Sequence, residues 1–89
     1  MIAKKVTVCN PNGLHLKPAG HLCNVALTYE CSITIHIREK YVNAKSVLGV
    51  LSACIKYGDE IEIICNGDDE ETAMEEILQC INRGLGEQL

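Results

Sequence analysis

The sequence contains no phenylalanine and no tryptophan, and three tyrosines are the only aromatic residues among its 89. A hydrophobic core must therefore be built from aliphatic side chains, and the 47% hydrophobic content is sufficient for a folded protein. The shortage of aromatic rings counts against single-stranded nucleic-acid binding, because such sites stack bases on aromatic side chains. The net charge of −4 counts against nucleic acid in general, since its binders present basic surfaces. We expect no nucleic-acid partner.

The chain also lacks any uncharged apolar run approaching the roughly 18 residues that a membrane-spanning helix requires. Residues 1–5 include two lysines but lead into alternating residues, without the apolar stretch of a secretory signal. We therefore expect a cytoplasmic protein with no membrane insertion. A chain of 89 residues is long enough for one hydrophobic core and too short for two, so residues 1–89 are expected to form a single domain.

Six cysteines are present, but there is no C-x-x-C pair and no cysteine and histidine cluster with zinc-finger spacing. Disulfides are rare in cytoplasmic proteins. We expect these cysteines to be small buried hydrophobic residues or incidental thiols, with no metal and no cofactor. The alternative is a cysteine-based metal or redox protein.

Charge is distributed unevenly along the chain. Residues 1–58 carry seven basic and two acidic residues, whereas residues 59–89 carry one basic and ten acidic residues. Such a distribution predicts either a polarised surface that steers an acidic protein or an anionic group toward one side, or two solvated faces without a partner.

The hydrophobic pattern predicts four strands and three helices. The strands are expected at 2–8, 32–37, 41–44 and 60–65, and the helices at 17–27, at 47–53 and from an N-cap at Asp68 or Asp69 to Gly84. The stripe expected to bury the first helix is Ala19, Leu22, Cys23, Ala26 and Leu27, and that of the last is Met74, Ile77, Leu78 and Ile81. The order β-α-β-β-α-β-α favours an α+β sandwich with helices on one face of the sheet.

Residues 12–19 put a histidine where the first helix begins. His15 would there face unpaired backbone N–H groups and the positive end of the helix dipole, with the ammonium of Lys17 close in sequence. Both effects favour a neutral, nucleophilic imidazole near pH 7. The same donors suit a phosphoryl group attached to the ring. These residues alone indicate either phosphoryl transfer or an ordinary surface histidine in a turn.

Residues 13–19 resemble the active-site motif of the HPr family, the histidine-containing phosphocarriers of the bacterial phosphoenolpyruvate-dependent sugar phosphotransferase system. Residues 42–52 are similar to the regulatory-serine region of HPr from Gram-positive bacteria, and residues 58–63 also match. The resemblance implies an open-faced β-sandwich, in which three helices cover one face of a four-stranded antiparallel sheet. This fold agrees with the element order predicted from the pattern.

The resemblance implies that His15 accepts a phosphoryl group on Nδ1 from the phosphorylated first enzyme of the system. His15 would pass it to the A component of a sugar-specific permease, so that the chain is a monomeric carrier and not an enzyme. Ser46 would be modified by a regulatory serine kinase and phosphatase, which links the chain to carbon catabolite control and its transcription factor. The alternative is an HPr-like regulatory module that acts mainly through Ser46.

The short helix at 47–53 is apolar nearly all round, so part of it is expected at the surface. The expected partner-binding residues are Leu16, Gly20, Val47, Leu48 and Leu51. For Leu48 and Leu51 the alternative is packing in the core.

The chain departs from the family at Lys17, where the usual residue is arginine. Lysine keeps the positive charge but lacks the planar fork that grips a phosphate with two hydrogen bonds. His21 lies six residues after His15 and should point elsewhere, while His36 is expected on the polar face of its strand. Cys54 is expected near the His15 loop if the family fold holds.

Overall fold

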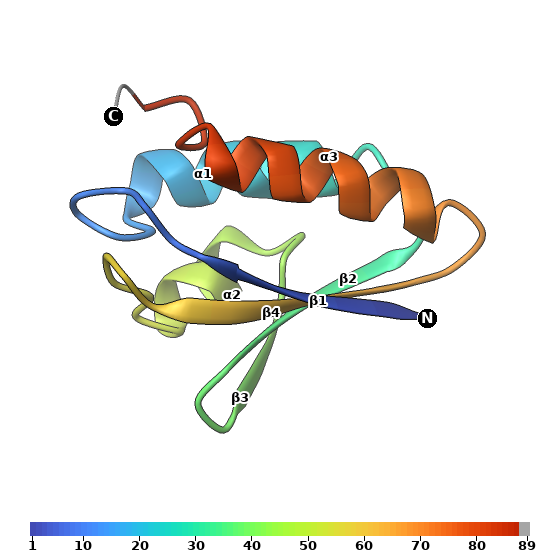
Figure 1. Ribbon diagram of the computed structural model, residues 1–89, viewed down its shortest axis with the longest axis horizontal. Coiled ribbons are helices and arrows are strands. Elements are labelled where there is room, and N and C mark those ends of the chain that lie inside the picture. The colour runs from blue at the N-terminus through green and yellow to red at the C-terminus, as the bar shows by residue number, and fades with distance from the viewer. Residues whose placement is uncertain (88–89) are drawn as a thin grey trace.

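The computed structural model describes residues 1–87 and has the predicted order of elements (Figure 1). The strands are β1 (Ile2–Thr7), β2 (Ser32–Ile37), β3 (Lys40–Asn43) and β4 (Glu60–Asn66), and the helices are α1 (Leu16–Ala26), α2 (Val47–Ser52) and α3 (Glu70–Asn82). Element type is therefore correct throughout, with boundaries that differ from the expected ones by a few residues.

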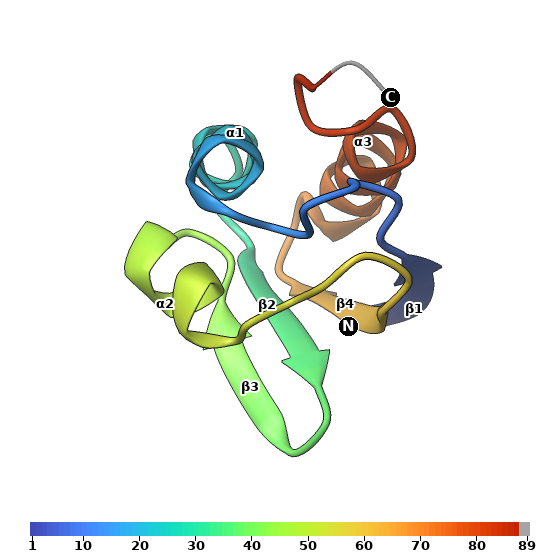
Figure 2. The ribbon, with the colours of Figure 1, turned by 90° about the vertical axis from the view of Figure 1, so that its left-hand side faces the viewer.

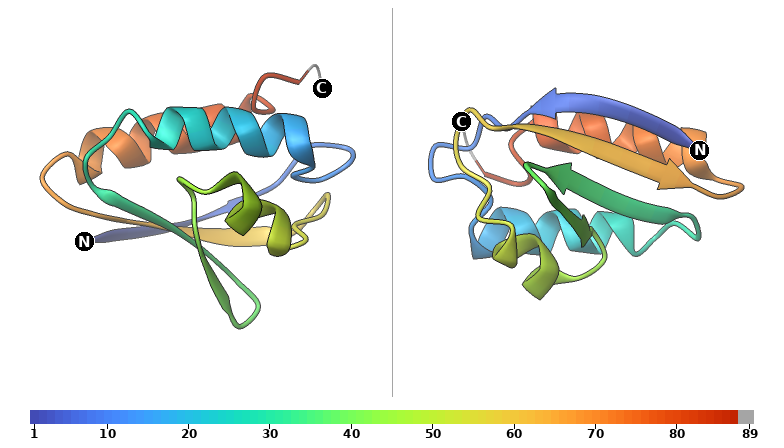
Figure 3. Two further views of the ribbon diagram at one scale, coloured as in Figure 1. Left: turned by 180° about the vertical axis from the view of Figure 1, so that it is seen from behind. Right: turned by 90° about the horizontal axis from the view of Figure 1, so that it is seen from below.

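The strands form one antiparallel sheet in the order β1-β4-β2-β3. Helices α1 and α3 lie side by side over one face of this sheet, and α2 flanks α1 near β3 (Figure 2). The opposite face carries no helix of residues 1–87 (Figure 3). The molecule is thus the open-faced sandwich that the resemblance implied.

The core lies between the sheet and the two long helices and is aliphatic, as the lack of aromatic residues requires. Strict alternation along β2 and β4 points every second side chain at the helices. The buried strand residues are Ile33, Ile35, Ile37, Ile61, Ile63 and Cys65, and the buried helix residues include Leu22, Ala26, Met74, Ile77 and Ile81. Leu27 was expected in this core but is 59% exposed, because α1 ends at Ala26 and Leu27 turns away as its C-cap.

The six cysteines are free thiols, of which Cys23, Cys31 and Cys65 are buried and Cys54 is exposed. Burial, assisted by a hydrogen bond with Asp69, raises the pKa of the Cys31 thiol to about 12. Within residues 1–87, no three cysteine, histidine or acidic side chains come together in a way that could hold a metal ion. In the same part of the chain no helix combines the length and apolar character that a membrane crossing demands.

Asp69 is the N-cap residue of α3, but its side chain does not cap that helix. Its carboxylate accepts hydrogen bonds from the backbone N–H groups of Glu30 (2.8 Å) and Cys31 (2.9 Å) instead. The Glu70 carboxylate reaches back to the turn before α3 and accepts the N–H of Gly67 (3.0 Å). Asp69 therefore joins the loop between α1 and β2 to the beginning of α3.

We expect Asp69→Asn to unfold at a lower urea concentration than the wild type at pH 7. The hydrogen bond from Glu30 N–H is the main cause that lowers the pKa of Asp69 below 3.8. A carboxyl group with a lower pKa in the folded state stabilises the fold above its unfolded pKa, and this contribution disappears as the pH falls through the folded pKa. The deficit of Asp69→Asn should therefore shrink steadily below about pH 4. Urea titrations of the exposed neighbour variant Asp68→Asn provide the control, and a deficit independent of pH would contradict the expectation.

Candidate functional site

His15 is the N-cap residue of α1, as the sequence predicts. Its backbone is extended (φ −76°, ψ −169°), its carbonyl accepts the N–H of Ala19 (2.9 Å), and its side chain makes no capping bond. Pro18 has no N–H, so Leu16 and Lys17 supply the first-turn amides that lack an acceptor within the helix. An imidazole that is 42% exposed thus stands beside the positive end of α1.

The loop before α1 is held by the segment that follows α2. The N–H of Leu14 donates to the carbonyl of Ile55 (3.0 Å), and the N–H of Gly13 closes a turn onto the carbonyl of Asn10 (2.9 Å). Leu14 itself is buried. Cys54 directly precedes Ile55, so it lies beside this loop as expected. The His15 loop is therefore anchored at both the backbone and a buried side chain.

A carboxylate that the sequence did not point to also contacts His15. Glu87 Oε2 lies 2.9 Å from His15 Nε2, and Glu87 Oε1 accepts a hydrogen bond from Asn10 Nδ2 (2.8 Å). The bond from Asn10, followed by the one to His15, lowers the pKa of Glu87. The two residues are 72 positions apart in the chain, so no local pattern could have paired them. Only the glycines after α3 indicated that the chain turns there.

Lys17 is exposed on the first turn of α1, and its ammonium is among the charges that lower the pKa of Glu87. His21 is exposed and adjoins Gly86, since a Cβ on that glycine would lie 2.9 Å from His21 Nδ1. His15 and His21 do not pair, as the helical spacing predicted.

His36 is remote from this site. Its ring stacks on Tyr41 with a centroid separation of 4.1 Å, and its Nδ1 lies 3.3 Å from Glu62 Oε1. These three residues share the helix-free face of the sheet. The predicted position of His36 on the polar face of its strand is therefore correct. These neighbours half-bury its side chain, so it is less exposed to solvent than an isolated surface histidine.

Ser46 is the N-cap residue of α2, and its Oγ accepts the N–H of Gly49 (3.0 Å). The backbone of Gly49 lies close to the serine side chain, because a Cβ on Gly49 would lie 3.2 Å from Ser46 Oγ. The serine is half-buried. Its hydroxyl therefore already serves the start of α2 before any modification.

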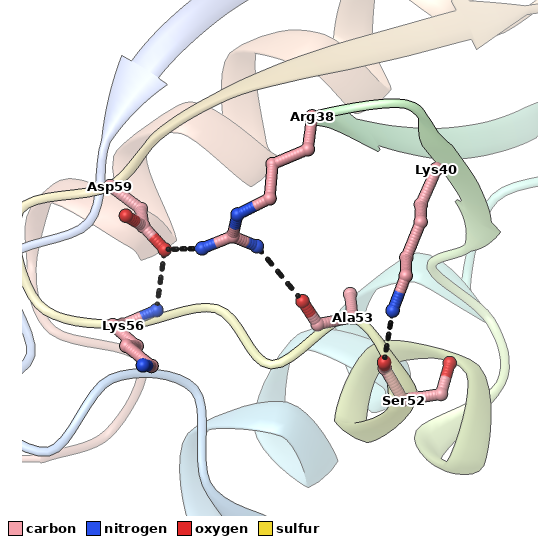
Figure 4. Close-up of polar contacts among 6 residues, drawn as sticks. All are labelled: Arg38, Lys40, Ser52, Ala53, Lys56 and Asp59. Carbon is pink, nitrogen blue, oxygen red and sulfur yellow. Dashed lines mark hydrogen bonds and ion pairs between the residues drawn. The ribbon is translucent and has the colours of Figure 1, made fainter.

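The far end of α2 is held by two basic residues of the β2–β3 hairpin (Figure 4). The Arg38 guanidinium donates to the carbonyl of Ala53 (3.3 Å) and to Asp59 Oδ2 (3.1 Å), and Lys40 Nζ donates to the carbonyl of Ser52 (3.2 Å). Cations at a helix C-terminus complement its dipole. The segment after α2 therefore contacts both the β2–β3 hairpin, through Arg38, and the His15 loop, through the bond from Leu14 to Ile55.

The five residues expected to bind partners differ in exposure. Leu16 is 67% and Leu48 is 79% exposed, whereas Gly20, Val47 and Leu51 are half-buried. Packing in the core is therefore wrong for Leu48 and partly right for Leu51, which packs against the core cluster. The two helices that carry these residues, α1 and α2, lie next to each other and pack together (Figure 2).

We expect Ser46→Ala to lower the free energy of unfolding by about 1 kcal/mol, the usual cost of losing an N-cap hydroxyl. The reason is that the amide of Gly49 loses its acceptor. Ser46→Asp, which keeps an acceptor oxygen at the cap, is the matched control and should remain near the wild type in urea unfolding. An equal loss in both variants would contradict a capping role.

The comparisons with known proteins agree with this geometry. The family model described as "PTS HPr component phosphorylation site" matches residues 2–83. The phosphocarrier protein HPr of Lysinibacillus sphaericus is 35% identical over 75 residues, which cover 84% of this chain and 85% of that protein. The HPr-like protein Crh of Halalkalibacterium halodurans is 36% identical over 83 residues, covering 93% and 99% respectively. The crystal structure of HPr-C-His from Thermoanaerobacter tengcongensis superposes with a TM-score of 0.95 at 31% identity and covers both chains completely. The chain therefore belongs to the HPr family.

Proposed function

We propose that this chain is a phosphocarrier in which His15 accepts a phosphoryl group on Nδ1 from the phosphorylated first enzyme of the sugar phosphotransferase system. His15 then passes the group to a sugar-specific A component. The observation that supports this most is the exposed imidazole at the N-terminus of α1 in a chain of the HPr family. The chain acts as a substrate in the relay and carries out no turnover of its own.

The N-terminus of α1 supplies what a transient phosphoryl group needs. The free amides of Leu16 and Lys17 are donors for phosphoryl oxygens, and the Lys17 ammonium adds a positive charge. A helix-end interaction of roughly 0.3 to 1 kcal/mol stabilises the phosphorylated state only slightly. The group therefore stays transferable, which a carrier requires.

Ser46 is the proposed regulatory site for a serine kinase and phosphatase. Phosphate there adds about −1.5 to −2 charges at the start of α2, a position that tolerates negative charge without unfolding. The proposed docking surface consists of Leu16, Gly20, Val47, Leu48 and Leu51, and its support is the exposure of Leu16 and Leu48. The new charge would repel an acidic partner from this surface or offer a docking feature to a transcription factor.

A second candidate is a regulatory module of carbon catabolite control, which acts mainly through Ser46. The similarity to the HPr-like protein Crh supports it, as does Lys17 in place of the usual arginine. On either proposal the chain is a cytoplasmic monomer that uses no cofactor and binds no nucleic acid.

Intact-mass measurement separates the two candidates. The chain is incubated with phosphoenolpyruvate and the first enzyme, and separately with ATP and a serine kinase of a Gram-positive bacterium. One acid-labile phosphoryl group from the first reaction supports the carrier. Labelling at Ser46 alone, with none from phosphoenolpyruvate, overturns the carrier and favours the regulatory module.

A further inference from the structure

The carboxylate of Glu87 is held between a buried amide and the ring of His15. Glu87 Oε1 accepts from Asn10 Nδ2 at 2.8 Å, while Glu87 Oε2 meets His15 Nε2 at 2.9 Å. The Glu87 side chain is 19% exposed, against 42% for His15. This carboxylate is therefore part of the His15 site although it comes from the turn after α3.

The orientation of Asn10 is determined by its surroundings. Asn10 is 0% exposed, and its Nδ2 donates both to the carbonyl of Gly84 (2.8 Å) and to Glu87. A backbone carbonyl only accepts hydrogen bonds, so the amide must turn its NH₂ group toward Gly84. The second N–H of that group then faces residue 87. Asn10 consequently offers a donor, and never an acceptor, to the side chain at position 87.

The backbone around Glu87 is also fixed. The N–H of Glu87 donates to the carbonyl of Gly84 (2.9 Å), and the N–H of Leu85 donates back to the carbonyl of Cys80 (2.9 Å), which ends α3. Leu85 is buried. The carboxylate therefore approaches His15 from an anchored turn.

A carboxylate that only accepts hydrogen bonds selects the tautomer of a neutral histidine. When Glu87 binds Nε2, the ring proton stays on Nε2 and the lone pair is on Nδ1. Nδ1 has no hydrogen-bond partner among residues 1–87, so its lone pair is free. A nitrogen must hold a lone pair to attack phosphorus, and Nδ1 is the nitrogen named in the proposed function.

We infer that Glu87 is a positioning residue for His15, which keeps the proton on Nε2 and the attacking lone pair on Nδ1 before and after transfer. This inference rests on the proposed phosphocarrier function. In the step, the Nδ1–phosphorus bond forms while the bond from phosphorus to the donor breaks, and the electron pair of that bond stays with the donor. The Nε2 proton does not move, and Glu87 then faces a ring that has become cationic. No proton has to leave the site in either direction.

Two substitutions at position 87 should differ in a direction that simple structural damage would not produce. In Glu87→Ala the ring loses its partner, and the proton distributes between the two nitrogens. In Glu87→Gln the Asn10 N–H donates to the oxygen of the new side-chain amide, so the NH₂ group of that amide faces His15 Nε2. That NH₂ donates to Nε2 and drives the ring proton to Nδ1, where it blocks the attacking lone pair. The larger defect is thus expected in the more conservative variant.

The test combines nitrogen-15 NMR of His15 with labelling by phosphoenolpyruvate and the first enzyme. With the ring neutral, we expect the wild type to show a protonated Nε2, Glu87→Ala an averaged pair of nitrogen signals, and Glu87→Gln a protonated Nδ1. We expect labelling about tenfold slower in Glu87→Ala and slower still in Glu87→Gln, within the roughly 10- to 100-fold range that orienting partners of histidine carry in metal sites. Glu75→Gln, an exposed change on α3 away from the site, is the control.

Equal nitrogen-15 signals and equal labelling rates in all variants would overturn the role of Glu87, and so would faster labelling of Glu87→Gln than of Glu87→Ala. The NMR measurement needs no donor protein. If the wild type takes up no label but the NMR order is as expected, the phosphocarrier proposal fails while the control of the ring by Glu87 stands.

Discussion

His15→Ala is expected to take up no phosphoryl group from phosphoenolpyruvate and the first enzyme, measured as intact mass with an acid-lability control. The variant lacks the nucleophilic nitrogen, and neither remaining histidine can replace it. His21 adjoins the turn at Gly86, and His36 stacks on Tyr41 on the helix-free face of the sheet. Because His15 is exposed, the substitution should leave the fold intact, and the labelling at Ser46 by a serine kinase should persist.

Substitutions at Lys17 should change the rate of labelling without abolishing it. Lys17→Gln removes a charged donor beside the phosphoryl group and should slow labelling at least about tenfold, since hydrogen bonds to charged groups contribute roughly 1.5 to 3 kcal/mol. Lys17→Arg restores a planar fork and should label faster than the wild type. Residual acid-labile label in His15→Ala would show that another residue is the acceptor.

Local patterns predicted well those elements that bury one face between the sheet and the helices. Alternation in residues 32–37 identified both the strand and its buried face, since Ile33, Ile35 and Ile37 all point at the helices. The prediction that Leu27 is buried was wrong because its spacing continues the helical stripe, whereas the helix ends one residue earlier, at Ala26. Periodicity reports the face of a helix but not where the helix ends.

The candidate site likewise contains features that neighbouring residues determine and contacts that form only through the tertiary fold. The positions of His15 and Ser46 at the starts of α1 and α2 are local properties of a few neighbouring residues, whereas the roles proposed for them come from the resemblance to the HPr family. The bonds from Glu87 to His15 and from Asp69 to the backbone of residues 30 and 31 join segments that meet only through the tertiary fold. An aspartate at an N-cap ordinarily accepts an amide of its own helix, so the predicted N-cap position was correct, but the local pattern could not show that the Asp69 carboxylate binds other amides.

Gly13→Ala is expected to have the largest effect on stability. Gly13 has φ +67°, and a Cβ there would lie 2.3 Å from the carbonyl oxygen of Ile55 and 2.8 Å from the Cα of Lys56. Both obstacles are backbone atoms, so the loop before α1 must move away from the segment after α2. That movement breaks the hydrogen bond from Leu14 N–H to Ile55, on which the His15 loop depends. We expect the free energy of unfolding to fall by about 3 kcal/mol or more, with slower phosphoryl uptake at His15.

Two other glycines separate the causes of this loss. Gly58 has φ +83° but open space where a Cβ would lie, and Gly20 lies within α1 with neither constraint. Gly58→Ala should therefore cost only about 1 to 2 kcal/mol for its left-handed backbone, while Gly20→Ala should stabilise the chain by up to about 1 kcal/mol through helix propensity. Urea unfolding of the three variants gives the order directly. If Gly13→Ala is no less stable than Gly58→Ala, the close approach to Ile55 does not hold the His15 loop, and the slower uptake expected for Gly13→Ala loses its physical reason.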